Sequence, residues 1–156
     1  MENVTIRPMT VSDVETCAQM VSTTPLWQRY NVTLESASAH FSAGLSDGAV
    51  ILVADNGKGI PLGFVWLAKR GAFDRSGYIR WIAVAADCRS RGVGQQLLTA
   101  AEEHTRQMSS DIFLLCSDFN MSARRFYERN GYDQVGALPD YVLVGTSELI
   151  FRKRLR

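Results

Sequence analysis

Apolar residues recur along the chain with two periods, one typical of strands and one typical of helices. Residues 4–9 (VTIRPM) alternate apolar and polar side chains, which predicts a short strand with one buried face. Residues 49–55 (AVILVAD) form a continuous apolar run that predicts a buried strand, and residues 62–70 (LGFVWLAKR) predict the next one. Because NGKGIP supplies turn residues between these two runs, we expect them to form a hairpin.

Two helices are predicted in the first third of the chain. Residues 10–22 begin with Thr10, a helix-capping residue, which is followed by Asp13. The apolar residues of this segment recur near helical spacing, and they are Val11, Val14, Ala18 and Val21. A second helix is expected over residues 34–45 (LESASAHFSAGL), after the aromatic stretch LWQRYNV.

The middle of the chain predicts a strand, a helix and a strand. The strands are residues 78–85 (YIRWIAVA) and 111–116 (DIFLLC), and the helix is residues 89–108. One stripe of the helix is formed by Val93, Leu97, Ala101, Thr105 and Met108. Such a unit normally joins two parallel strands through a right-handed crossover.

The last quarter predicts a helix and a terminal hairpin. Residues 122–130 (SARRFYERN) form the helix, which Asn130 and Gly131 terminate. Residues 132–138 (YDQVGAL) and 147–155 (SELIFRKRL) predict the two closing strands. The order of elements predicts an α/β fold with a mixed, mostly antiparallel sheet, a central parallel strand pair and helices on both faces. No linker interrupts it, so we expect a single domain over residues 1–156.

Composition restricts the function classes. The formal net charge is +1 with 21% charged residues, which argues against nucleic acid or a membrane as partner. The start of the chain lacks the pattern of a signal peptide, and three scattered cysteines without a CxxC pair indicate reduced thiols, so we expect a cytoplasmic protein. His40 and His104 are isolated, and no metal site is expected.

The stretch CRSRGVGQQLL, residues 88–98, places glycines and arginines between a predicted strand and a predicted helix. It does not contain the P-loop pattern GxxxxGK[ST]. It also fails to match GxGxxG, because Leu97 stands at the third glycine position. Glycines at a helix start leave backbone N–H groups accessible at the positive end of the helix dipole, which suits a pyrophosphate. The alternative is a tight turn that needs small residues only for packing.

Two motifs together resemble the GCN5-related N-acetyltransferase (GNAT) family, whose members use acetyl-CoA. The first is Arg-x-x-Gly-x-Gly at residues 89–94, and the second is NMSARRFYERNGY at residues 120–132. The order of the predicted elements agrees with that family over the whole chain. The resemblance implies transfer of an acetyl group from acetyl-CoA, as co-substrate, to a primary amine of a small molecule or a peptide by direct attack in a ternary complex.

The resemblance also implies roles for particular residues. The cofactor would be bound by Ile82, Ala83, Val84, Arg89, Ser90, Arg91, Gly92, Val93, Gly94 and Asn120. Asn120 has the simpler alternative of a helix cap. Tyr127 would be the general acid that protonates the departing sulfur. The alternative for Tyr127 is a buried aromatic residue whose hydroxyl is satisfied by the protein.

The sequence departs from the family where a general base is expected. Many relatives carry a glutamate at the position of Tyr78, and others carry one at the position of Leu115. The remaining titratable candidates are Glu35, His40, Asp74, Asp118 and Asp140, with Asp118 the best placed. A water relay or an acceptor amine with a low pKa is an equally good alternative.

The family's acceptor pocket would draw on the first two helices, their connection and the last hairpin. The candidates are Trp27, Arg29, Tyr30, Tyr78, Asp118 and Tyr141. Aromatic walls with one arginine suit an acceptor that bears an acidic group, whereas the alternative is that Trp27 and Tyr30 cover the core. Two competing functions are an acyl-CoA sensor without catalysis and a nucleic-acid-binding domain using the arginines of SARRFYER and FRKRLR. Exposed strands also leave a homodimer open.

Overall fold

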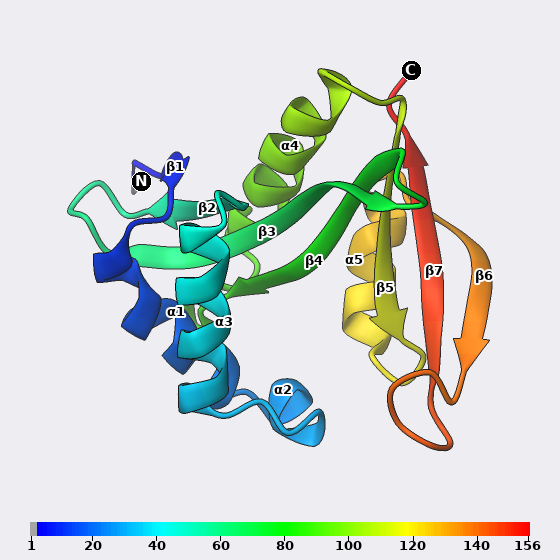
Figure 1. The fold of residues 1–156 in the computed structure, drawn as a ribbon, viewed down its shortest axis with the longest axis horizontal. Helices are drawn as coiled ribbons and strands as arrows, with labels where there is room; N and C mark the ends of the chain where they lie inside the picture. The colour runs from blue at the N-terminus through cyan, green and yellow to red at the C-terminus, as the bar shows by residue number, and fades with distance from the viewer. Residues whose placement is uncertain (1–2) are drawn as a thin grey trace. The chain divides into compact units, whose positions relative to one another are not determined.

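The computed structural model describes residues 3–156, which form an α/β fold around a seven-stranded sheet (Figure 1). The strands are β1 (Thr5–Pro8), β2 (Val50–Asp55), β3 (Pro61–Ala72), β4 (Ser76–Val84), β5 (Asp111–Ser117), β6 (Asp133–Pro139) and β7 (Ser147–Arg154). Their order across the sheet is β1-β2-β3-β4-β5-β7-β6. The sheet is mostly antiparallel, and β4 and β5 form its parallel pair, which confirms the predicted fold class.

Five α-helices and two short 3-10 helices connect these strands in the described residues. The helices are η1 (Val11–Asp13), α1 (Val14–Ser22), α2 (Pro25–Arg29), α3 (Leu34–Ser46), η2 (Ala86–Cys88), α4 (Val93–Arg106) and α5 (Met121–Arg129). By their internal contacts the residues fall into two compact units. Unit 1 comprises the chain up to Leu67 together with Trp81–Ala101, and unit 2 comprises Ala68–Arg80 together with Glu102–Arg156. The single domain expected for residues 1–156 stays a prediction.

Unit 1 is built around an aromatic core. The rings of Phe41 and Phe64 lie 4.9 Å apart, and Phe41 also stacks on Trp66 at 5.8 Å. Helices α1 and α3 lie side by side over this core, and both contribute fully buried residues such as Val21 and Ala37. The predicted hairpin of β2 and β3 is confirmed, since Val50 pairs with Leu67 in an antiparallel register.

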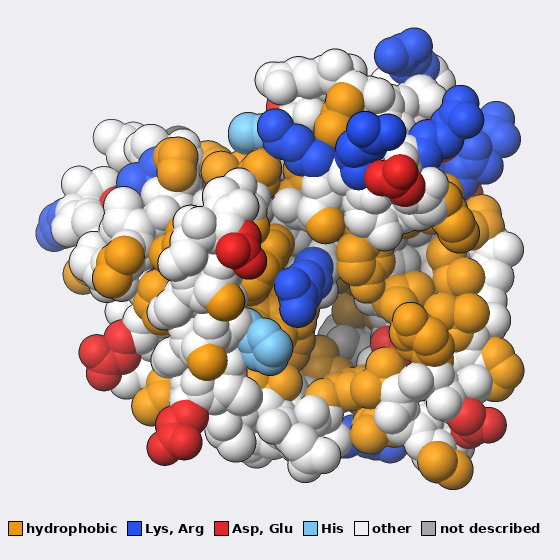
Figure 2. Space-filling view, in the orientation of Figure 1, with side chains coloured by type: hydrophobic (Ala, Val, Ile, Leu, Met, Phe, Trp, Pro, Cys, Tyr) orange, Lys and Arg blue, Asp and Glu red, His pale blue; other side chains and the backbone are white. Residues whose placement is uncertain are grey.

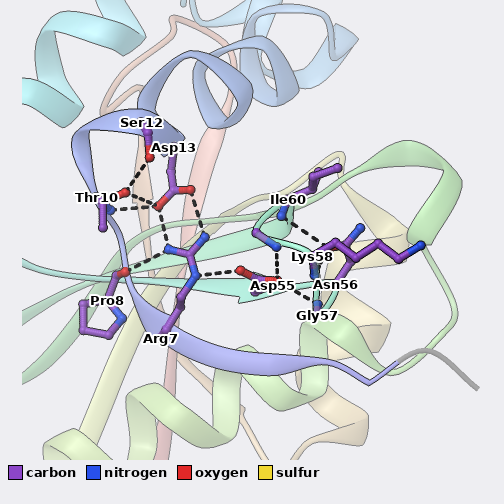
Figure 3. A network of polar contacts seen from close by, with 11 residues as sticks. Arg7, Pro8, Thr10, Ser12, Asp13, Asp55, Asn56, Gly57, Lys58 and Ile60 are labelled. Carbon is purple, nitrogen blue, oxygen red and sulfur yellow. Dashed lines mark hydrogen bonds and ion pairs between the residues drawn. The ribbon is translucent and has the colours of Figure 1, made fainter.

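A buried ionic network fixes β1 to the rest of unit 1 (Figure 3). The guanidinium of Arg7 donates to both carboxylate oxygens of Asp13, at 2.7 and 3.0 Å, and to Asp55 at 2.7 Å. Asp55 also accepts the backbone N–H groups of Gly57 and Gly59. Hydrogen bonds from Arg7 are the main cause that lowers the pKa of Asp13 and that of Asp55. Both carboxylates therefore stay charged and paired inside the fold.

Unit 2 contains the parallel contact and the closing hairpin. Gly77 lies opposite Ile112, and the register continues to Ile79 opposite Leu114. Strand β5 then continues to Ser117 along β7, and β6 lies on the outer side of β7 (Figure 1). The predicted parallel unit and terminal hairpin are both confirmed.

Two basic side chains near the end of the chain form internal ion pairs. Figure 2 shows Lys and Arg side chains gathered where the chain ends. Arg152 donates to Asp111 at 2.7 Å, and Lys153 donates to Glu102 at 2.9 Å. These pairs fix Arg152 and Lys153 of β7 to acidic residues of unit 2.

Some predicted boundaries were wrong. The helix expected over residues 89–108 begins only at Val93, because Ser90 and Gly92 adopt left-handed backbone angles, with φ of 66° and 81°. Met108 lies beyond the end of this helix and is 38% exposed. Val11 was expected on a buried stripe, yet it is 81% exposed, because residues 11–13 form a 3-10 turn rather than the first turn of α1. Helix α2 was not predicted.

The three cysteines are free thiols and all are buried. Burial raises the pKa of Cys17 and that of Cys116 to about 12. No helix within residues 3–156 is long and apolar enough to cross a membrane. The same residues contain no group of three or more His, Cys, Asp or Glu side chains arranged for a metal ion.

Candidate active site

The loop before α4 has the form expected of an anion site. Arg89, Ser90, Arg91 and Gly92 are exposed, and Gly92 leads directly into the 14-residue helix α4. A Cβ atom built on Gly92 would meet no atom within 4 Å, so the backbone here is open to an approaching group. The first N–H groups of a helix cannot bond within the helix, and the loop therefore presents donors at the positive end of a dipole.

The end of β4 precedes this loop in unit 1. Ile82, Ala83 and Val84 are half-buried, and the N–H of Ala85 donates to the carbonyl oxygen of Leu62 at 2.8 Å. Gly63 on β3 approaches this backbone closely, since a Cβ atom there would lie 2.7 Å from the carbonyl oxygen of Ala83. Only glycine fits at this contact, which keeps the end of β4 flat against β3.

Two candidates named from the sequence in unit 1, one for the acceptor pocket and one for the base, pack against Trp81. Trp27 of α2 packs edge-on against the Trp81 ring at 5.3 Å, and His40 of α3 does so at 5.6 Å. Trp27 packs against the core cluster, as the core-covering alternative expects. Tyr30 is half-buried, and Arg29 is exposed at the end of α2. A role for these residues in an acceptor pocket stays a prediction.

Helix α5 in unit 2 begins with the predicted cap. The side-chain oxygen of Asn120 accepts the backbone N–H of Ala123 at 3.2 Å. Asn120 is therefore a helix cap, and its predicted cofactor contact is compatible with that role because the side chain is only half-buried. The helix ends at Arg129, followed by Asn130 and by Gly131 with φ of 90°, as the sequence predicted.

Tyr127 and Tyr132 are both buried, but their hydroxyl groups differ. The hydroxyl of Tyr132 donates to Glu102 at 2.9 Å, whereas that of Tyr127 makes no hydrogen bond within residues 3–156. Burial raises the pKa of Tyr127 well above its ordinary value of 10, and the neighbouring Cys116 thiol raises it further. The satisfied buried hydroxyl that was the alternative for Tyr127 is found at Tyr132 instead.

Three polar or charged side chains act electrostatically on Tyr78 of β4. Burial raises the pKa of Tyr78, and the nearby Tyr141 and Glu148 raise it further, whereas Arg80 lowers it. The structure therefore brings Tyr78 and Tyr141, which were predicted from separate segments, near one acidic residue. Glu148 of β7 is 7% exposed and was missed from the sequence, where it reads as part of an ordinary strand.

Four of the base candidates named from the sequence are exposed or take part in local hydrogen bonds. Glu35 is exposed in the first turn of α3, and Asp74 is exposed in the turn between β3 and β4. Asp140 accepts the N–H of Gly145 at 2.6 Å and so closes the loop between β6 and β7. Asp118 accepts the N–H of Ser147 at 3.1 Å, which ties the end of β5 to the start of β7. Asp118 and Asp140 therefore have local structural roles.

Solved acetyltransferases share this fold. Ard1 from Thermoplasma volcanium superposes with a TM-score of 0.81 at 20% identity, covering 98% of each chain. YncA from Salmonella typhimurium, described as an acetyltransferase with its cofactor acetyl-CoA, gives a TM-score of 0.76 at 17% identity, covering 99% of this chain and 95% of that one. Identities this low establish the fold alone.

The family follows from the sequence itself. Residues 15–132, more than half of the chain, match the model of the acetyltransferase (GNAT) family, and the chain belongs to that family. The L-methionine sulfoximine/L-methionine sulfone acetyltransferase of Pseudomonas paraeruginosa is 29% identical over 126 residues, which cover 76% of this chain and 70% of that protein. These findings confirm the predicted class of enzyme, an acetyl-CoA-dependent N-acetyltransferase.

Proposed function

We propose that the chain transfers the acetyl group of acetyl-CoA to a primary amine by direct attack in a ternary complex. The observation that carries this proposal is the exposed loop of residues 89–92, which leads through the left-handed Ser90 and Gly92 into the start of α4. Two arginines flank the donors of this loop, and arginine suits phosphate because its planar fork donates two parallel hydrogen bonds.

The residues present suit a CoA thioester in their chemistry. The backbone of Arg89–Gly94 would bind the pyrophosphate, and the backbone groups of Ile82, Ala83 and Val84 would pair with the pantetheine arm as an added strand does. Asn120 would contribute a further polar contact beside its role as a cap. Acetyl-CoA supplies the activated acetyl group, and the remaining chemistry is proton transfer by side chains of this chain.

Tyr127 is proposed as the general acid. Aminolysis of a thioester expels a thiolate, and a proton delivered to that sulfur assists cleavage of the C–S bond. A raised pKa keeps the Tyr127 hydroxyl protonated at neutral pH, and the absence of a hydrogen-bond partner within residues 3–156 leaves its proton available to a ligand. The proton of the Tyr132 hydroxyl is already used, since Glu102 accepts it.

The acceptor is proposed to be an amine the size of an amino acid. The relative from Pseudomonas paraeruginosa is named for L-methionine sulfoximine and L-methionine sulfone, which are α-amino acids with a polar side chain. The aromatic residues Trp27, Tyr30 and Tyr141, with Arg29, would suit the carboxylate and the short side chain of such a compound. These residues are proposed as acceptor contacts together with Tyr78 and Asp118.

Thiol release from acetyl-CoA tests this function. The purified chain is incubated with acetyl-CoA and, separately, L-methionine sulfoximine, L-methionine sulfone, other amino acids, polyamines, aminoglycosides and short peptides. We expect acceptor-dependent release of CoA with the amino-acid class, and acetylated product by mass spectrometry. The double substitution Arg89→Ala with Arg91→Ala is expected to raise the dissociation constant of acetyl-CoA by about tenfold or more, because each charge-assisted hydrogen bond contributes about 1.5–3 kcal/mol.

The outcomes separate the competing functions. Tight binding of acetyl-CoA without transfer to any amine would favour the acyl-CoA sensor. Failure to bind acetyl-CoA, measured by calorimetry, would contradict the role given to the loop. Transfer to peptides but not to amino acids would keep the reaction and reject the acceptor class.

A further inference from the structure

Glu148 is a buried carboxylate that the proposed function does not yet use. It is the second residue of β7, is 7% exposed, and accepts a hydrogen bond from the hydroxyl of Ser117 at 3.3 Å. Burial of a carboxylate costs free energy unless the group is paired or hydrogen-bonded. A glutamate at such a position therefore needs a structural or a chemical explanation.

Strand register shows which face of the unit 2 sheet carries Glu148. Cross-strand partners point to the same face, and Glu148 lies opposite Ser117 of β5. Side chains alternate along β5, so Ser117 shares its face with Leu115 and Phe113, and Phe113 lies opposite Tyr78 of β4. Glu148 and Tyr78 therefore belong to one face.

Tyr127 belongs to the opposite face. Its ring lies 6.0 Å from that of Phe151, and Phe151 pairs with Leu114, one residue out of phase with the Glu148 series. An acid and a base on opposite faces of the sheet, near the end of β5, suit a reaction in which one group protonates the leaving sulfur and the other receives the proton of the attacking amine.

The surroundings of Glu148 are polar as well as buried. Tyr78 and Arg80 of β4 and Tyr141 of the β6–β7 loop lie in the same electrostatic neighbourhood. Glu148 also raises the pKa of the Cys116 thiol on β5. Asp118 holds the residue before it, because its carboxylate accepts the N–H of Ser147. The start of β7 is thus held by Asp118, and the Glu148 carboxylate accepts a hydrogen bond from Ser117.

Tyr78 of β4 and Leu115 of β5 lie on the same face of the sheet as Glu148. We propose that the Glu148 carboxylate is the general base, which takes a proton from the acceptor ammonium before attack. This inference rests on the proposed function and assigns the base that function lacks. The base is thus supplied by β7.

In this reaction every proton and every bond is accounted for. The acceptor ammonium gives one proton to Glu148, and Glu148 later releases this proton to solvent. The lone pair freed on the nitrogen then forms the C–N bond with the thioester carbon. The C–S bond breaks as Tyr127 gives its proton to the departing sulfur. Of the two protons left on nitrogen, one stays in the amide and the other restores the Tyr127 hydroxyl. The products are the N-acetyl compound, CoA with a thiol, and one released proton.

The test compares Glu148→Gln with Glu102→Gln in the full chain. Glu102 is a matched control because it is also a buried carboxylate of unit 2, 4% exposed, bonded to Tyr132 and Lys153 on the other face. With acetyl-CoA and the best amine of the panel, kcat/KM is measured from acid to alkaline pH. E148Q is expected to lose about 10²–10⁴-fold near neutral pH, and the loss should shrink as pH rises, because the amine deprotonates in solution. E102Q should keep the wild-type pH profile.

Each outcome decides the matter. E148Q with wild-type kcat/KM, or with a loss that is the same at every pH and is matched by E102Q, would overturn the base role while leaving acetyl transfer intact. A wild-type chain that transfers to no amine would overturn the proposed function and this inference with it. If E148Q does not fold by circular dichroism, Glu148→Asp replaces it. E148D keeps a carboxylate on a shorter side chain, so it should show a lower rate with the acidic limb retained, and a pH profile without that limb would overturn the role.

Discussion

Tyr127 and Tyr132 stand five residues apart in the sequence, yet the structure places their hydroxyl groups in different surroundings. The hydroxyl of Tyr132 is closed off by Glu102, which is itself held by Lys153. That of Tyr127 has no hydrogen-bond partner within residues 3–156. The rings of the two tyrosines lie 5.9 Å apart. The hydrogen-bond partner of the hydroxyl oxygen therefore distinguishes the structural role of Tyr132 from the chemical role proposed for Tyr127.

The largest expected effect is on turnover. Tyr127→Phe removes the only proton that the proposal uses for the leaving sulfur, so kcat should fall by about 10–1,000-fold, the range that general acids contribute. The dissociation constant of acetyl-CoA should stay nearly the same, because the ring and its packing are kept. Steady-state kinetics and calorimetry measure the two quantities.

Tyr132→Phe is the matched control for that variant. Unchanged kcat in Y127F would remove Tyr127 from the acid role. Equal losses of kcat in Y127F and Y132F would show that both tyrosines act through packing. That result would reject the different roles assigned to their hydroxyl groups.

The second effect is on stability. Tyr132→Phe leaves the buried carboxylate of Glu102 without one of its two hydrogen-bond donors. The free energy of unfolding should fall by about 1.5–3 kcal/mol, the usual contribution of a hydrogen bond to a charged group. Urea denaturation measures it. A Y132F variant as stable as the wild type would indicate that the bond to Glu102 contributes nothing.

The smallest effect is the alkaline dependence of stability. Burial is the main cause that raises the pKa of Tyr127 and that of Tyr132 above the ordinary value of 10. The folded state then keeps protons that the unfolded chain releases, so this stability is complete below pH 10 and is lost as pH rises above it. Each tyrosine should already cost about 0.4 kcal/mol at pH 10. Melting temperatures of the wild type and of the Y127F/Y132F double variant are measured from neutral to alkaline pH. The melting temperature of the wild type should fall more steeply with rising pH than that of the double variant. Parallel curves would contradict the pKa directions.

Local signals in the sequence predicted most of the fold. The β2–β3 hairpin, the parallel β4–β5 pair and the terminal hairpin follow from runs whose period matches their element and from turn residues between them. The start of α4 was wrong because periodicity does not report a left-handed Ser90. Helix α2 was missed because the five residues from Pro25 to Arg29 are too few to show a period.

The candidate site divides in the same way. The loop at residues 89–94, Asn120 and Tyr127 stand in contiguous motifs, so the resemblance could name them. Glu148 could not be named, because its environment depends on the pairing of β7 with β5, which brings it opposite Ser117 across 31 positions of sequence. The one available signal is a charged residue at the head of an otherwise apolar run, SELIF, and that pattern also describes ordinary edge strands.

The burial of all three cysteines determines how the protein can be observed. Cys17 is fully buried, and Cys88 and Cys116 are each 5% exposed. A thiol-reactive dye will therefore label released CoA at once and the folded chain only as it opens, so one reagent reports catalysis and unfolding on separate timescales. Cys88 immediately precedes Arg89, so its labelling rate reports how often the loop opens. A bound pyrophosphate should lower this labelling rate.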